Sequence, residues 1–93
     1  MSVNNLKEVN IDKLKKIKTG FKIQSYKLNM ECWSDRKFDT LIDLLSYIHC
    51  VLNPAFYIKI LNANNRVQLF DGFVSDFRDQ TKDTEIVKSF YIN

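Results

Sequence analysis

The sequence predicts an α+β fold in which an antiparallel sheet of three to four strands packs on one long helix, with a short N-terminal helix. Three observations predict it: a helical apolar stripe within residues 34–53, alternating apolar residues in several other segments, and a scarcity of turn residues. Only two Gly and one Pro occur in 93 residues, which favours regular elements with short connections. A chain of this length is expected to form a single domain, residues 1–93.

The long helix is predicted at about residues 35–52. Its apolar residues follow the i, i+3, i+4 spacing of one helical face: Phe38, Leu41, Ile42, Leu45, Ile48, His49 and Leu52. Ser34 or Asp35 can accept hydrogen bonds from the first free N–H groups, and Pro54 ends the helix after Asn53. This stripe is wide enough to cover the apolar face of a small sheet, so Leu45→Asp is expected to unfold the protein.

The short N-terminal helix is predicted from Ile11 to Thr19, with Asn10 as its N-cap and Gly20 after its last turn. A continuous helix from Val3 would place Asn10 in the middle of its apolar face. Residues 1–10 are therefore expected to be frayed or disordered.

One long strand is predicted from Phe21 to Cys32. Its alternation changes phase at Ser25 and Tyr26, where a β-bulge would keep both sets of apolar residues on the core face. A tight turn at that point is the alternative, but neither Gly nor Asn-Gly marks a hairpin there.

A β-hairpin is predicted in the second half of the chain. Residues 55–61 and 66–70 alternate in polarity, and the asparagine-rich segment 62–65 between them tolerates the left-handed conformations of a hairpin turn. The Asp-Gly pair at 71–72 predicts a turn or bulge, followed by an irregular or short helical segment. The sequence EIVKSFYI, residues 85–92, alternates again and is predicted to be the last strand.

The composition favours a cytosolic protein. The first ten residues are polar where a signal peptide needs an apolar core, and no run approaches the ~20 apolar residues of a membrane span. Cys32 and Cys50 are too few for a disulfide framework, so two reduced thiols are expected. Membrane association is not predicted.

Candidate chemistry is sparse, and we predict a non-enzymatic protein without catalytic, cofactor-binding or metal sites. His49 is the only histidine, and it lies inside the helical apolar stripe about 100° around the helix from Cys50. A partly buried histidine held by a hydrogen-bond partner accounts for it better than a nucleophile pair or a zinc ligand. The acidic residues after position 70 lack the ligand spacing of a calcium loop.

The leading functional prediction is a protein-binding surface on the aromatic and acidic segment that follows the hairpin. Aromatic anchors beside charged residues are typical of protein interfaces. The residues predicted to bind the partner are Asp71, Phe73, Asp76, Phe77 and Asp79.

The alternative prediction is nucleic-acid binding through lysines near the N-terminus. The net charge is only +3, but the first 30 residues carry about +5 and the remainder about −2. The residues predicted to contact phosphates are Lys13, Lys15, Lys16, Lys18 and Lys22. The same cluster is compatible with a solvated helix face or with an acidic protein partner.

An apolar outer sheet face would account for several exposed side chains. Tyr57 and Leu61 alternate away from the predicted core, as do Val87 and Tyr91 in the predicted last strand. A partner, the N-terminal helix or a second copy in a homodimer would cover such a face.

The segments NRVQLFDGFVSDF and EIVKSFYI resemble small accessory proteins of phages and mobile elements in low-GC Gram-positive bacteria. The resemblance covers roughly residues 55–92. It implies a strand, an acid-glycine bend, an irregular stretch and a closing strand. It also implies an inhibitor or regulator of host machinery, such as an anti-CRISPR protein, that binds a partner and blocks its surface. Several acidic inhibitors of this kind mimic DNA, whereas this chain is net positive.

Overall fold

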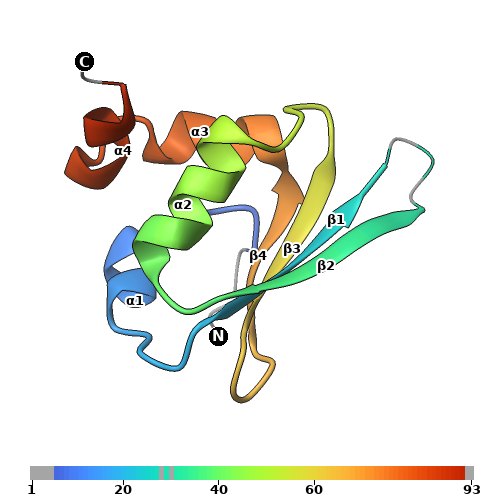
Figure 1. Cartoon of the computed structure of the whole chain (residues 1–93), viewed down its shortest axis with the longest axis horizontal. Helices are drawn as coiled ribbons and strands as arrows, with labels where there is room; N and C mark the ends of the chain where they lie inside the picture. Colours follow the sequence, from blue (N-terminus) through green and yellow to red (C-terminus); the bar gives the residue numbers. More distant parts are fainter. Residues whose placement is uncertain (1–5, 28, 30, 92–93) are drawn as a thin grey trace, which may run out of the picture.

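The protein is an α+β structure with four helices on one side of a four-stranded antiparallel sheet (Figure 1). The computed structural model describes residues 6–27, 29 and 31–91. The elements in chain order are α1 (Ile11–Lys15), β1 (Phe21–Tyr26), β2 (Cys32–Phe38), α2 (Leu41–Cys50), β3 (Tyr57–Asn62), β4 (Gln68–Phe73), α3 (Val74–Thr81) and α4 (Glu85–Phe90). The strands are ordered β2-β1-β3-β4, which confirms the predicted fold class and antiparallel sheet.

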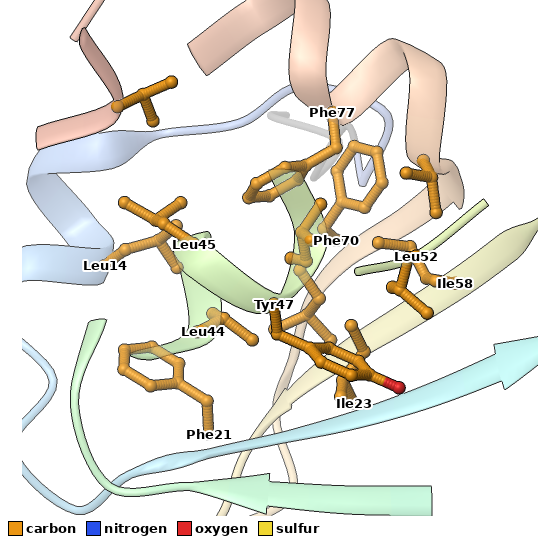
Figure 2. Packing of buried hydrophobic residues seen from close by; sticks show 14 residues of the cluster. Leu14, Phe21, Ile23, Leu44, Leu45, Tyr47, Leu52, Ile58, Phe70 and Phe77 are labelled. Carbon is orange, nitrogen blue, oxygen red and sulfur yellow. The ribbon is translucent and has the colours of Figure 1, made fainter. Parts of the chain in front are cut away.

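The core lies between α2 and one face of the sheet (Figure 2). Leu44, Leu45 and Ile48 of α2 are fully buried, as are Ile23 of β1 and Ile60 of β3. The strands alternate buried residues on this face with less buried residues on the other. Because all the described helices lie on the core side, the opposite face of the sheet has no helical cover (Figure 1).

The predicted long helix begins six residues too early. Residues 32–38 form the edge strand β2, and α2 begins at Leu41 and extends for ten residues. Thr40, rather than Ser34 or Asp35, is the N-cap, and its side chain accepts a hydrogen bond from the Asp43 N–H. The prediction failed because Phe38 fits the helical spacing of the stripe although it belongs to β2. Its ring packs against that of Tyr47, with the two centroids 5.0 Å apart.

The predicted single strand from Phe21 to Cys32 is two strands joined as a hairpin. β1 ends at Tyr26 and β2 begins at Cys32, and their register shifts between Ser25 and Tyr26, where the sequence changes phase. An asparagine side chain supports the turn in place of glycine, since Asn29 Oδ1 accepts from the Glu31 N–H. Leu28 and Met30, which contributed to the predicted alternation, lie outside the described residues.

The predicted second hairpin is confirmed by β3 and β4, which pair antiparallel. The left-handed residue of its loop is Arg66, with φ of 59°, and not one of the preceding asparagines. The asparagines instead accept backbone hydrogen bonds: Asn62 Oδ1 from the Asn64 N–H, and Asn65 Oδ1 from the Val67 N–H. Asp71 and Gly72 are part of β4 and do not form a turn.

The predicted last strand is wrong, because residues 85–90 form α4. Thr84 caps this helix by accepting from the Val87 N–H, and Val87 is fully buried. Val87 therefore lies in the core and not on an outer sheet face, and Tyr91 follows the helix.

The N-terminal helix is shorter than the predicted Ile11 to Thr19. Asn10 is its N-cap, as predicted, and accepts from the Lys13 N–H. The expected break before Asn10 agrees with the start of α1 at Ile11. In the segment before the helix, the Leu6 carbonyl accepts from the Asp71 N–H and the Val9 N–H donates to Gln80. Residues 1–5 lie outside the described residues.

A search of the described residues for a helix long and apolar enough to cross a membrane found none.

Candidate functional site

The most prominent surface feature is the sheet face opposite the helices, which we call the open sheet face. Strand alternation places on it the residues between the buried positions of β1, β3 and β4. Pairing with β1 adds two residues of β2 that lie opposite Lys22 and Gln24. The open sheet face comprises Lys22, Gln24, Tyr26, Asp35, Lys37, Tyr57, Lys59, Leu61, Asp71 and Phe73.

Three aromatic side chains form a row across this face. Tyr26 of β1 pairs in register with Tyr57 of β3, and Tyr57 pairs with Phe73 of β4. The Tyr57 and Phe73 rings meet edge to face, with centroids 5.1 Å apart. Phe73 is 45% exposed, whereas the two tyrosines are half-buried among their neighbours. The row therefore forms an aromatic strip over three adjacent strands.

Lysine ammonium groups lie directly over this strip. The Lys59 Nζ is 5.5 Å from the centroid of the Tyr26 ring, and the Lys7 Nζ is 4.9 Å from that of Tyr57. Lys7 reaches the sheet from the N-terminal segment, which is fixed beside β4 by the bond between the Leu6 carbonyl and the Asp71 N–H. Its Nζ also donates to the Tyr57 hydroxyl at 2.8 Å.

Lysines and carboxylates lie side by side on this surface. Lys7, Lys22, Lys37 and Lys59 lie on or against it, and the carboxylates near them are Asp35, Asp39, Asp71 and Asp76. The hydrogen bond to Tyr57 raises the pKa of Lys7 above its ordinary value, with further support from nearby Asp71. Lys22 and Asp35 form an ion pair of 3.4 Å at one side of the strip. Lys7, bonded to the Tyr57 hydroxyl, and Lys59, 5.5 Å from the centroid of the Tyr26 ring, can contact an anion beside a group stacked on the strip.

A second candidate is the cavity around His49, with a volume of about 350 Å³. It is lined by His49, Pro54, Ser75, Arg78, Asp79, Lys82 and Tyr91. Three of its charged side chains have partners within the protein. Arg78 donates to the carbonyls of Ile48 and Leu52 at the end of α2, and Asp79 pairs with Lys82 at 3.0 Å.

His49, which lines this cavity, has a hydrogen-bond partner at each ring nitrogen. Its side chain is 6% exposed, its Nε2 is 2.7 Å from Thr81 Oγ1, and its Nδ1 is 3.2 Å from the Tyr91 hydroxyl. Burial, with a smaller contribution from the Arg78 charge, lowers the pKa of His49 below its ordinary value. Both ring nitrogens are occupied by neutral partners, so the imidazole can take a substrate proton only after one of these bonds breaks. Cys50, its neighbour in sequence, is exposed and free.

The structure separates the predicted aromatic and acidic site. Asp71 and Phe73 lie on the open sheet face, whereas Asp76 and Asp79 are exposed on α3. Phe77 is wrongly placed in that site, because it is fully buried with its ring centroid 5.1 Å from that of Phe70. An aromatic side chain at this position stabilises the core and is unavailable to a partner.

The predicted lysine cluster is also divided. Lys13 and Lys15 lie on α1, Lys16 is its C-cap and Lys18 follows, all of them exposed. Lys22 belongs to the open sheet face. The predicted lysines therefore lie on two separate surfaces.

Among the described residues, no group of three or more His, Cys, Asp or Glu side chains is arranged to hold a metal ion. Comparisons of the chain with protein-family models, with curated proteins and with solved structures found no match.

The aromatic strip cannot be read from the sequence because its members come from three separate segments. Alternation within residues 55–61 predicts Tyr57 on the outer face, and the structure agrees. Alternation after the phase change predicts Tyr26 in the core, because the residues on its side are apolar. Only the register of β1, β3 and β4 shows that Tyr26, Tyr57 and Phe73 are aligned.

Proposed function

We propose that this protein is a non-enzymatic binding module that binds single-stranded nucleic acid through the open sheet face. The observation that carries the proposal is the row of Tyr26, Tyr57 and Phe73 with the ammonium groups of Lys7 and Lys59 over it. Unpaired bases stack on aromatic rings, and lysines beside the rings contact the phosphates between successive bases.

The geometry favours a single strand over a duplex. Stacking needs a base whose face is free, and a duplex presents only base edges and phosphates to a flat surface. Each stacked base contributes ~1–3 kcal/mol, and stacking depends little on base identity. The module is therefore expected to bind with little sequence preference.

Fluorescence anisotropy with a labelled oligothymidylate of about 12 nucleotides tests the proposal, since such modules cover roughly 4–16 nucleotides. The protein should bind it more tightly than a duplex of equal length, and the affinity should fall as salt rises. Phe73→Ala should weaken binding roughly 5- to 150-fold. No binding at low salt, or tighter binding of the duplex, would refute the proposal.

Matched variants separate stacking from charge. Tyr57→Phe keeps the ring and should retain most binding, whereas Tyr57→Leu should lose affinity as Phe73→Ala does. Lys59→Gln should weaken binding and reduce the salt slope by about 1. Lys88→Gln makes the same charge change at an exposed position of α4, on the helical side of the sheet. It should leave the affinity and the salt slope unchanged. Equal effects of Lys59→Gln and Lys88→Gln would show that net charge, and not this face, attracts the oligonucleotide.

A further inference from the structure

A groove beside α1 forms a second surface, distinct from the open sheet face. Its volume is about 580 Å³, within the range of sites that hold a ligand. It is formed by residues of α1 and the segment after it, of the start of α2 with the two residues before it, and of α4. The groove is lined by Lys15, Ile17, Lys18, Asp39, Thr40, Leu41, Ile42 and Ile86.

The groove has an apolar floor. Ile17, Leu41 and Ile86 are half-buried and pack against the core, so their positions are fixed by the fold. Ile42 is 57% exposed although it lies on α2, which is otherwise the main helix of the core. The exposed Ile42 side chain and the three half-buried aliphatic side chains in the same groove provide an apolar surface that a partner would cover.

The rim of the groove is positively charged. Lys15 and Lys18 line it, and Lys13 and Lys16 are exposed on the same short segment. The one acidic lining residue, Asp39, lies 4.0 Å from Lys37. An apolar floor within a basic rim is complementary to an acidic segment that carries apolar side chains on one side.

We propose that this groove binds an acidic amphipathic segment of a partner protein. Apolar side chains of the segment contact Ile42 and Ile86, and its carboxylates contact Lys15 and Lys18. A second copy of the chain fits less well, because its own lysine rim would face an identical rim. Nucleic acid fits less well because the groove is lined by aliphatic side chains, on which bases do not stack as they do on aromatic rings.

This proposal does not depend on nucleic-acid binding. The open sheet face and the groove lie on opposite sides of the sheet, so the two ligands can be bound together (Figure 1). A protein partner is also what the sequence favours first, although it predicts that partner at a different surface.

Selection from a displayed random peptide library against the folded full chain tests the groove without assuming the partner's sequence. Selected peptides should be enriched in Asp and Glu and carry apolar residues at i, i+3 or i+4 spacing. A chosen peptide should shift the backbone resonances of Ile17, Ile42 and Ile86 and should not compete with the oligothymidylate. Absence of enrichment, enrichment of basic peptides, or resonance shifts confined to the sheet would overturn the proposal.

Variants complete the test. Ile42→Asp should weaken peptide binding roughly 10-fold or more, and it should preserve folding because acidic residues are favourable in the first turn of a helix. Lys18→Glu should also weaken binding, while Lys27→Glu, at an exposed position after β1 and outside the groove lining, should change it less than about 2-fold. Unchanged affinity in Ile42→Asp would contradict the proposal. A dimer in sedimentation that Ile42→Asp dissociates would overturn it in favour of a second copy.

Discussion

The Nε2 atom of His49 lies 2.7 Å from Thr81 Oγ1. This hydrogen bond connects α2 to the last residue of α3. The Thr81 hydroxyl donates its single proton to the Phe77 carbonyl at 2.8 Å. It can therefore only accept from His49, which places the imidazole proton on Nε2 and leaves Nδ1 to accept from the Tyr91 hydroxyl. The structure thus fixes His49 in one neutral tautomer.

The first prediction is a pH-dependent stability that originates at His49. Burial lowers the pKa of His49 in the folded protein, so the unfolded chain binds a proton at a higher pH than the folded chain. The contribution of His49 to stability is complete above its ordinary pKa of about 6.5 and is lost as the pH falls toward the lower folded pKa. Urea unfolding of His49→Gln should show a weaker dependence on pH across this window. An identical pH profile in the variant would contradict the prediction.

The second prediction concerns Arg78, which donates to the carbonyls of Ile48 and Leu52 at the C-terminal end of α2. These carbonyls have no helical partner, so a cation there satisfies them and is favoured by the helix dipole. A bond to a charged group contributes about 1.5–3 kcal/mol, but Arg78 is only half-buried, so water replaces part of what the two bonds supply. Arg78→Ala should therefore lower the free energy of unfolding by about 2–4 kcal/mol.

The same variant should raise the pKa of His49, because the Arg78 charge opposes protonation of the imidazole. Titration of the single histidine by NMR measures this shift. Lys82→Ala, which removes an exposed ion pair with Asp79, should change stability by less than about 1 kcal/mol. An equal loss in Lys82→Ala and Arg78→Ala would show that the helix end does not depend on Arg78.

The third prediction compares two residues of α2. Leu45 is fully buried, and Leu45→Ala should cost about 2–5 kcal/mol of unfolding free energy. Ile42 is 57% exposed, and Ile42→Ala should change that energy by about 0.5 kcal/mol or less. Chemical denaturation of the two variants measures the difference, and similar losses would contradict the orientation of α2.

The sequence predicted the elements with a single clear periodicity and failed in segments that lack one. Residues 34–38 contain a single apolar residue, Phe38, which fits the helical stripe, but these residues pair with β1 and form a strand. In residues 85–90, the apolar residues Ile86, Val87 and Phe90 fit helical spacing as well as alternation. The segment forms a helix, and the Thr84 side chain caps its first turn. The signal that was missed in both segments is a threonine at the helix start, Thr40 and Thr84.

The candidate surfaces were predicted less well than the fold, because both are assembled from distant segments. The lysines were identified, but the groove exists only where Ile86 of α4 approaches α2. The resemblance to accessory proteins of mobile elements, and a role as an inhibitor of host machinery, remain predictions. Phe77 illustrates the limit of local reasoning, since its acidic neighbours are exposed while it faces the core.

The last prediction contrasts two buried hydroxyl groups. Within the described residues, the Ser25 hydroxyl is fully buried without a hydrogen-bond partner, as are the hydroxyls of Ser34, directly opposite, and Tyr47. An unsatisfied buried polar group costs about 1–3 kcal/mol, so Ser25→Ala should leave the free energy of unfolding unchanged or raise it by up to about 1 kcal/mol.

Thr81→Val should have the opposite effect, because the Thr81 hydroxyl bonds both His49 and the Phe77 carbonyl. Its removal leaves the His49 Nε2–H without a partner in a buried site and should cost about 1–3 kcal/mol. Urea denaturation of both variants at a pH about one unit above the ordinary histidine pKa of about 6.5, where His49 is neutral, measures the contrast. A destabilised Ser25→Ala beside an unaffected Thr81→Val would mean that the polar contacts between α2 and α3 are not those that the structure shows.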